Sequence, residues 1–318
     1  MSGHIVEAVN LNKFFKRGKG MLHAVENVSF TIDAGKTLGV VGESGCGKST
    51  LGRTVIRLTE PTAGEIKFKG ESITGLSKRE LKARRNGMQM IFQDPFSSLN
   101  PRMSVISLIM DPMRVNHLYH SKEERYAKAR ELMDTVGLAR RVEDSYPHEL
   151  DGGRRQRIGV ARALALEPEF IVCDEPVSAL DVSIQAQILN LLMDLQDERG
   201  LTYMFITHDM SVVKHISDEI MVMYMGQCVE RAPVDDMFEN PSHPYTKALL
   251  SAIPVPSIEW KGREPQILRG EVSSPVDPKK ACRFAPRCEL CMERCQSEEP
   301  AEYEITPGHM VKCHLFDK

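Results

Sequence analysis

Short apolar runs, separated by amphipathic stretches, recur along the chain. A run of about four to eight apolar residues between turn signals is typical of a strand buried on both faces, as in the parallel sheet of an α/β protein. Runs of this kind stand at 38–41, 170–173, 203–206 and 220–225. They predict the central sheet of an α/β fold.

Other segments show the periods of half-buried strands and of amphipathic helices. Val28, Phe30 and Ile32 alternate with polar residues, and so do residues 65–69, which indicates two half-buried strands. Ser121 and Glu124 form a capping box, which predicts a helix start. Two helix faces follow, made of Ala129, Leu132, Met133 and Val136 up to Gly137, and of Ile184, Ile188, Leu191 and Leu195.

The amino-acid composition of the chain changes after residue 253. Prolines become frequent there and mark an extended connection into a cysteine-rich tail. These prolines are Pro254, Pro256, Pro265, Pro275 and Pro278. We therefore expect one domain at 1–253 and a C-terminal extension at 254–318.

Composition and charge narrow the class of protein. Hydrophobic residues make up 42% and charged residues 27% of the 318 residues, which suits a soluble globular protein. The 41 Lys and Arg against 44 Asp and Glu leave a net charge of −3, without the basic excess of a nucleic-acid-binding chain. No apolar run approaches the about 18 residues of a membrane span, and residues 1–15 lack the basic start and apolar block of a signal peptide. We expect a cytosolic location, in which the eight cysteines form no disulfide framework.

A phosphate-binding loop is predicted at 42–50, GESGCGKST, which fits the pattern GxxxxGK[ST] between an apolar strand and a helix. Glycines let backbone N–H groups face the phosphates, and the helix adds its positive end. Lys48 would reach the terminal phosphates, and the Ser49 hydroxyl would bind Mg²⁺. The predicted ATP-binding residues are Gly42, Glu43, Ser44, Gly45, Cys46, Gly47, Lys48, Ser49 and Thr50.

Two carboxylates, Asp174 and Glu175, end the apolar strand at 170–173. In P-loop ATPases the first holds Mg²⁺ through its water shell, which leaves the second free to polarise the attacking water. Alone, two acids at a strand end would be interpreted as solvated charges. The phosphate loop in the same chain favours the catalytic interpretation.

Taken in order, these motifs resemble the ATP-binding subunits of ABC transporters over residues 5–253. The resemblance implies an ABC-type P-loop ATPase core with an antiparallel β subdomain and a helical subdomain near 94–160, plus the cysteine-rich extension. It also implies a Q-loop glutamine at Mg²⁺, a D-loop, a switch histidine at the γ-phosphate and an aromatic ring on adenine. The matching residues are Gln93, then Ser178 and Asp181, then His208, and Phe15 with Phe14 as second choice.

The signature motif departs from the family pattern. In ABC ATPases two subunits pair head to tail, and each signature closes over the ATP of the other. LDGGR at 150–154 stands in place of LSGGQ, so the residues that act on the partner's ATP are Asp151, Gly152, Gly153 and Arg154.

The Asp151 carboxylate has two interpretations. At about 4 Å from a phosphate charge it is repelled by about 1 kcal/mol in water and about 4 kcal/mol at an effective dielectric of 20, which would weaken that site. Hydrolysis would then be dominated by the nucleotide that this chain itself binds. In the alternative, Asp151 is an N-cap and Arg154 neutralises it.

The C-terminal part narrows the resemblance. HPYTKALLSAIP at 243–254, CRFAPRC at 282–288 and a late Cys-His are similar to the oligopeptide/dipeptide branch of importers, which includes nickel transporters. This implies an unlike pair of ATPase chains beneath two membrane permeases, fed by an extracellular binding protein. The chain would be peripheral, at the cytoplasmic face of the plasma membrane. Within 94–115, Phe96, Leu99 and Met103 form either a socket for a permease helix or part of the core.

Two other functions stay open. Nickel or another small solute fits the same residues, because this subunit does not touch the cargo. A soluble ABC ATPase that acts on nucleic acid or ribosomes is disfavoured, because the chain has one uninterrupted ATPase core and its basic stretch at 82–85 is short.

The cysteine cluster comprises Cys282, Cys288, Cys295 and Cys313, separated by five, six and seventeen residues. Thiolates gathered in this way indicate a metal site, with tetrahedral Zn²⁺ and an iron–sulfur cluster as the candidates. The gaps are wider than those of common zinc ribbons, and the resemblance to peptide importers implies [4Fe–4S], with Zn²⁺ as the alternative. Cys291 is left unassigned. We expect the metal to staple a tail that is poor in apolar residues.

Overall fold

The computed structural model describes residues 3–253 and 275–317. By its internal contacts the chain forms two compact units. The first unit contains 1–5, 33–36 and 75–204, and the second contains 6–32, 37–74 and 205–318. The predicted helical subdomain near 94–160 falls within the first unit.

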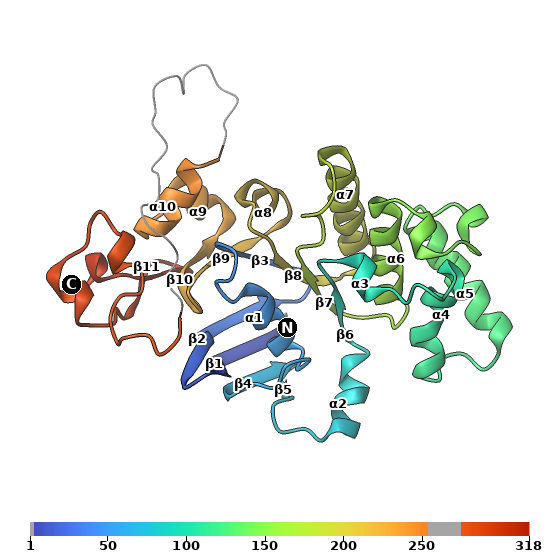
Figure 1. The fold of residues 1–318 in the computed structure, drawn as a ribbon, viewed down its shortest axis with the longest axis horizontal. Helices are drawn as coiled ribbons and strands as arrows, with labels where there is room; N and C mark the ends of the chain where they lie inside the picture. The colour runs from blue at the N-terminus through green and yellow to red at the C-terminus, as the bar shows by residue number, and fades with distance from the viewer. Residues whose placement is uncertain (1–2, 254–274, 318) are drawn as a thin grey trace, which may run out of the picture. The chain divides into compact units, whose positions relative to one another are not determined.

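In the first unit, two parallel strands are accompanied by helices (Figure 1). The strands are β6 (Met88–Ile91) and β7 (Phe170–Asp174). The helices are α2 (Lys78–Arg85), α3 (Pro95–Ser98), α4 (Val105–Val115), α5 (Lys122–Thr135), α6 (Gly152–Leu164) and α7 (Val182–Arg199). The helices α4, α5 and α6 pack against one another. Strand β8 (Thr202–Ile206) carries the chain into the second unit.

The predicted helix start at Ser121 is confirmed, although the Glu124 carboxylate accepts from the His120 N–H and so completes no capping box, and the two predicted faces are confirmed in part. The Ser121 hydroxyl accepts a hydrogen bond from the Glu124 N–H at 3.0 Å and caps α5. Ala129, Leu132 and Met133 are buried on one face of this helix. On α7 the predicted face is buried at Ile188 and Leu195.

In the second unit, a four-stranded sheet has the order β2-β1-β4-β5. Its strands are β1 (His4–Arg17), β2 (Gly20–Asp33), β4 (Ala63–Phe68) and β5 (Glu71–Ser72). Strand β4 pairs antiparallel with both β1 and β5, which confirms the antiparallel subdomain. The alternating segments at 28–32 and 65–69 fall in β2 and β4, as predicted.

A second sheet of this unit is built on the buried strand β3 (Thr37–Val41), which pairs in parallel with β9 (Glu219–Tyr224). Antiparallel neighbours extend it through β10 (Gln227–Pro233), β12 (His309–Lys312) and β11 (Glu302–Thr306). The helices of the unit are α1 (Lys48–Val55), α8 (Met210–Ile216), α9 (Val234–Glu239) and α10 (Pro244–Ser251). All four apolar runs of the sequence are therefore strands, β3, β7, β8 and β9.

The C-terminal extension differs from the prediction in one respect. Its strand β12 pairs with β10, so the described residues 275–317 lie in the same compact unit as residues 205–253. The edge of β10 would otherwise leave backbone groups unpaired, and the extension covers it. The prolines Pro254, Pro256 and Pro265 lie outside the described residues.

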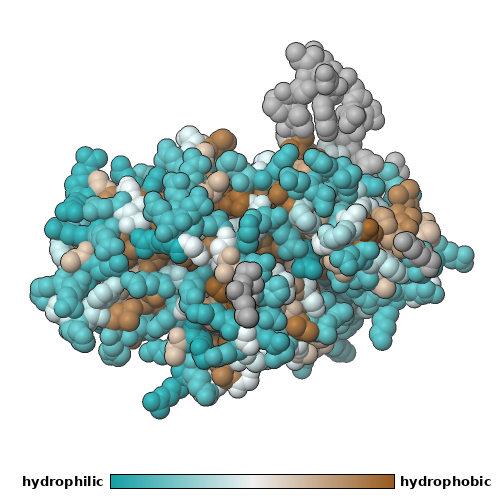
Figure 2. All heavy atoms as spheres, turned by 180° about the vertical axis from the view of Figure 1, so that it is seen from behind, coloured by the Kyte–Doolittle hydropathy of each residue, from teal (hydrophilic) through white to brown (hydrophobic). Residues whose placement is uncertain are grey.

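No helix within 3–253 and 275–317 combines the length and the apolar character that a membrane crossing requires. On the face of the molecule seen in Figure 2, hydrophilic side chains predominate over apolar ones.

A buried carboxylate joins three elements of the second unit. Glu230 on β10 is 1% exposed. Its oxygens accept hydrogen bonds from the N–H groups of Ser242 and His243, at 2.7 and 2.9 Å. The His309 Nε2 atom on β12 lies 2.8 Å away. Glu230 thus fixes the start of α10 and β12, the strand of the terminal hairpin that pairs with β10.

Replacing Glu230 by Ala leaves three buried polar groups without this partner. We expect the free energy of unfolding to fall by about 3 kcal/mol, the scale for leaving buried hydrogen-bonding groups without their partner. Thermal and denaturant unfolding of the full chain measure the effect. Glu302→Ala, an exposed carboxylate on β11, is the control and should change it by less than about 0.5 kcal/mol. Equal unfolding of the two variants would contradict this role of Glu230.

Candidate functional site

The phosphate loop follows the buried strand β3 and leads into α1. Gly47 is the N-cap of α1 with a φ of 108°. A Cβ atom on Gly47 would lie 2.0 Å from the Ala24 carbonyl oxygen, and one on Gly42 would lie 2.2 Å from that of Met223. Because no side chain fits at either position and both have a positive φ, the loop requires glycine there.

Lys48 closes this loop from inside. Its Nζ atom donates to the carbonyl oxygens of Gly42 and Glu43 at 2.8 and 3.0 Å, and the residue is 4% exposed. The ammonium group is therefore held at the base of a loop whose helix begins without an acidic residue in its first turn. A positive end of a helix and a fixed ammonium group are the elements of an anion site.

The predicted catalytic carboxylates end strand β7. Asp174 is fully buried, and Glu175 is half-buried with a φ of 47°. Positive φ in a non-glycine residue is strained and concentrates at functional sites. The Gln93 Nε2 atom donates to the Glu175 carboxylate at 2.9 Å. The first unit thus joins two residues that are 82 positions apart in the sequence, as the Q-loop interpretation requires.

The D-loop residues lie directly after these carboxylates. The Ser178 hydroxyl donates to the Glu175 carbonyl oxygen at 3.2 Å. Asp181 caps α7 by accepting from the Ile184 N–H at 3.0 Å, and this bond, with that from Ser183, lowers the pKa of the Asp181 carboxyl.

The switch histidine lies in the second unit. His208 is exposed just after β8. The preceding N–H, of Thr207, donates to the Val40 carbonyl oxygen of β3 at 3.1 Å. His208 therefore follows a residue attached to the strand that leads into the phosphate loop.

The two candidate aromatic residues project from opposite faces of β1, as successive strand residues must. The Phe15 ring is 38% exposed, and the Lys13 ammonium lies 4.7 Å from its centroid. The Phe14 ring stacks on His23 at 4.1 Å between centroids. Phe15 is thus the more accessible ring, and Phe14 already has a stacking partner.

The signature segment begins α6, and both features of the capping alternative are present in it. The Asp151 carboxylate accepts from the Arg154 N–H at 2.8 Å and lies 3.4 Å from the Arg154 Nε atom. Gly152 and Gly153 leave room for α7 and the residues before it, since added Cβ atoms would lie 3.0 Å from Leu180 and 2.7 Å from Ile184. Asp151 is therefore both an N-cap and a member of an exposed ion pair.

The contacts that sequence reasoning missed join the C-terminal region to the phosphate loop. The Arg287 guanidinium makes two hydrogen bonds to the Glu43 carboxylate, at 2.7 and 2.9 Å. The Tyr245 hydroxyl accepts from the Glu43 N–H at 2.9 Å. Both residues lie in motifs that marked the family branch, but no local pattern links positions 244 residues apart.

The cysteines of the extension lie close enough to influence one another. Burial, with the neighbouring Cys295 and Cys288, raises the pKa of Cys282 to about 11. Burial and other cluster thiols also raise the pKa of Cys288, among them Cys313 and Cys291. A cavity of about 590 Å³ borders Cys282 and Cys295. Among the described residues, however, no three His, Cys, Asp or Glu side chains are arranged as a metal site.

Comparison with known protein families gives two matches. Residues 25–178 match the model described as ABC transporter. Residues 229–295 match the model described as oligopeptide/dipeptide transporter, C-terminal region. The second match contains both Tyr245 and Arg287.

Similar proteins cover nearly the whole chain. The putative oligopeptide transport ATP-binding protein YkfD of Bacillus subtilis is 50% identical over 98% of this chain and 95% of its own length. The dipeptide transport ATP-binding protein DppF of Haemophilus influenzae is 47% identical over 98% of this chain and 97% of its own length. Among solved structures, the dimeric post-hydrolysis state of the ATP-binding cassette MJ0796 bound to ADP and Pi has a TM-score of 0.67 at 30% identity, over 72% of this chain and 98% of that one.

Proposed function

Because the chain belongs to the ABC transporter family, as an ATP-binding subunit of the oligopeptide/dipeptide importer type, we propose that it hydrolyses ATP with the residues described above and so drives peptide import. The observation that carries the proposal is the phosphate loop closed by Lys48. The same chain carries the hydrogen bond between Gln93 and Glu175 at the carboxylates that follow β7.

Lys48 has a role in both nucleotide binding and catalysis. In the structure its ammonium group is satisfied by two loop carbonyls. Incoming phosphate oxygens offer it stronger, charge-assisted acceptors, and it then stabilises charge on the γ-phosphoryl group as the bond to the leaving group breaks. Phe15 would stack on the adenine ring.

Mg²⁺ bound with ATP would neutralise phosphate charge, and Ser49, Gln93 and Asp174 are the residues that would hold it, as the family resemblance implies. These are hydroxyl, amide and carboxylate oxygens, the hard donors that Mg²⁺ takes. Glu175 orients and polarises the attacking water, and His208 contacts the γ-phosphate.

The signature motif would act on a second nucleotide, held by a homologous ATPase chain in a head-to-tail heterodimer. The similar cassette MJ0796 forms a dimer in its post-hydrolysis state, which supports the arrangement. Asp151 holds the first turn of α6 and is partly neutralised by Arg154, so the repulsion estimated from a bare carboxylate is reduced.

Two membrane permeases are the other proposed partners, and an extracellular binding protein would deliver the peptide to them. The chain would dock at the cytoplasmic face of the plasma membrane. Leu99 is 1% exposed and belongs to the core, whereas Phe96 is 50% exposed beneath the Arg155 guanidinium at 5.1 Å. Of these two residues, Phe96 is therefore the one that is accessible for a permease contact. Nickel or another small solute is the alternative cargo.

We propose further that Cys282, Cys288, Cys295 and Cys313 take up an iron–sulfur cluster, with Zn²⁺ as the alternative. The gathering of thiols beside a cavity supports this proposal, while the side chains as described do not form the site. No step of ATP hydrolysis depends on this group.

Replacing Glu175 by Gln removes the base but keeps an isosteric side chain. In the assembled transporter we expect ATP turnover to fall by about a hundredfold or more, the scale of general-base catalysis, while ATP binding is retained. Phosphate release and nucleotide binding measure the two effects. The equivalent change in the partner chain should reduce turnover less, if the Asp151 site is the weaker one. Equal losses would contradict the asymmetry.

Replacing Arg154 by Gln leaves the Asp151 carboxylate without its ion-pair partner. We expect ATP-promoted pairing with the partner chain to weaken by about two- to fivefold, the scale of an exposed ion pair, and Asp151→Asn in the same chain to restore it. Sedimentation of the pair with and without ATP measures this. Arg140→Gln, which removes the exposed pair with Asp134, is the control. Unchanged pairing of Arg154→Gln would show that Asp151 acts as a cap alone.

Anaerobic purification or reconstitution tests the metal proposal. We expect iron and acid-labile sulfide to be bound in the full chain, and Cys288→Ser to lower both, because a thiolate ligand is lost. Cys228→Ser, a cysteine of β10 outside the cluster, should leave both unchanged. Bound zinc without iron and sulfide would refute the iron–sulfur cluster.

A further inference from the structure

The phosphate loop carries a carboxylate that is held by the C-terminal extension. Arg287 and Glu43 form a two-point ion pair, and their side chains are 7% and 24% exposed. A planar guanidinium that meets a carboxylate at two points fixes its direction as well as its charge. The backbone N–H of Glu43 is also occupied, because it donates to the Tyr245 hydroxyl.

Arg287 itself is fixed by the packing around it. It ends a short 3₁₀ turn, Ala285–Arg287, between Cys282 and Cys288. Phe284, at the start of this turn, packs its ring against Tyr224 and Tyr245, with centroids 5.3 and 5.4 Å away. Burial also lowers the pKa of the adjacent His243 to about 3, so its neutral ring accepts from the Tyr245 N–H. The guanidinium is thus presented from a rigid aromatic cluster.

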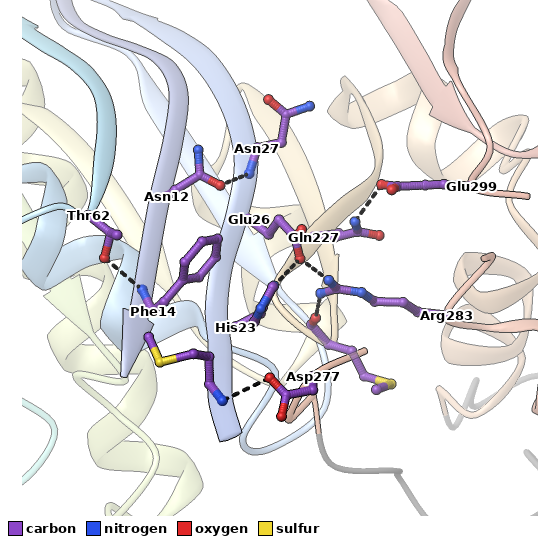
Figure 3. A network of polar contacts seen from close by, with 12 residues as sticks. Asn12, Phe14, His23, Glu26, Asn27, Thr62, Gln227, Asp277, Arg283 and Glu299 are labelled. Atoms are coloured by element: carbon purple, nitrogen blue, oxygen red, sulfur yellow. Dashed lines mark hydrogen bonds and ion pairs between the residues drawn. The ribbon is translucent and has the colours of Figure 1, made fainter. Parts of the chain in front are cut away.

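A second arginine of the same motif reaches the other side of the loop. The Arg283 guanidinium donates hydrogen bonds to the Glu26 carboxylate and to the Met225 carbonyl oxygen (Figure 3). The Glu26 carboxylate also forms a hydrogen bond with the His23 ring, and this ring stacks on Phe14. The next residue after Met225, Gly226, donates its N–H to the Cys46 carbonyl oxygen at 2.8 Å. The CRFAPRC motif therefore contacts the phosphate loop directly at Glu43 and reaches Cys46 through two successive residues, Met225 and Gly226.

An unpaired carboxylate in this loop would oppose its function. ATP brings several negative charges to the backbone N–H groups of 42–50, and a like charge nearby repels them with little screening in a partly buried site. The fold instead holds Glu43 in an ion pair with Arg287. With the negative charge of Glu43 neutralised, the loop repels the phosphates of ATP less.

We propose that Arg287 is a positioning residue for ATP: by neutralising and orienting Glu43 it makes the nucleotide affinity of the phosphate loop depend on the C-terminal extension. This inference rests on the proposed nucleotide site. Under this proposal, the segments CRFAPRC at 282–288 and HPYTKALLSAIP at 243–254 contribute to ATP binding, in addition to identifying the branch of the family.

The test uses the full chain and compares equilibrium binding of ATP, ADP and AMP. In Arg287→Gln we expect ATP to bind about tenfold more weakly, ADP to lose less and AMP least, because the repulsion grows with phosphate charge. Because the Glu43–Arg287 pair is largely buried, raising the salt concentration should change this loss little. Arg294→Gln is the matched control, since this arginine of the same extension pairs with Asp317 and not with the loop; its binding should match the wild type.

A second substitution separates charge from folding. Under the proposal, Glu43→Gln binds ATP about two- to threefold more tightly, and the double variant Arg287→Gln, Glu43→Gln recovers to within about threefold of wild type. No recovery, or equal losses for ATP, ADP and AMP, would show that Arg287 only stabilises the fold and would overturn the proposal. Wild-type affinity in Arg287→Gln would also overturn it. Lys48→Ala is included because wild-type ATP binding in that variant would refute the nucleotide site itself.

Discussion

An anion-binding loop needs its backbone N–H groups on the inside and no side chain between them and the anion. This constraint on the loop at 42–50 organises the second unit. The chain can turn tightly enough at Gly42 and Gly47 only because both lack a Cβ atom, with carbonyl oxygens of Met223 and Ala24 close behind them. Those carbonyls belong to β9 and β2, so each of the two sheets supplies a wall of the loop. The loop therefore depends on contacts with both sheets, and the Lys48 side chain closes it.

Two of the motifs predicted to face a phosphate contain a carboxylate, and in each the carboxylate is paired with an arginine. Asp151 and Glu43 each have an arginine, but the pairs differ in kind. Arg154 is three residues away, exposed, and approaches at 3.4 Å, so solvent and salt screen the pair strongly. Arg287 comes from 244 residues away, is nearly buried and binds at two points. At Asp151 the cap bond and the Arg154 ion pair of the alternative interpretation are both present, so this carboxylate repels a phosphate less than a bare charge would.

Local sequence predicted what local physics determines. The four apolar runs became strands because runs so short between turn signals suit strands buried on both faces, and Ser121 became a cap because its hydroxyl meets the N–H three residues on. The motif order predicted a Q-loop role for Gln93 and a catalytic role for Glu175, but their hydrogen bond is seen only in the structure. Long-range pairing was not visible in this way. Strand β12, the antiparallel partner of β10, lies beyond the proline-rich connection. The sequences EYEIT and HMVK of the terminal hairpin contain no feature that identifies β10 as their neighbour. Leu99 and Phe96, both apolar, were separated only by their burial, which depends on the packing of whole helices.

By its contacts, the described part of the terminal extension belongs to the same compact unit as the phosphate loop. Its hairpin covers the edge of β10, His309 completes the partners of Glu230, and Glu230 in turn holds the start of the helix that bears Tyr245. Tyr245 and Arg287 then meet on one residue of the phosphate loop, Glu43. A segment with few apolar side chains cannot maintain such contacts by burial alone, because its ordering entropy is large relative to the surface it hides. The gathered cysteines lie on both sides of Arg287 in the sequence, so whatever orders them also orders the guanidinium that faces the loop.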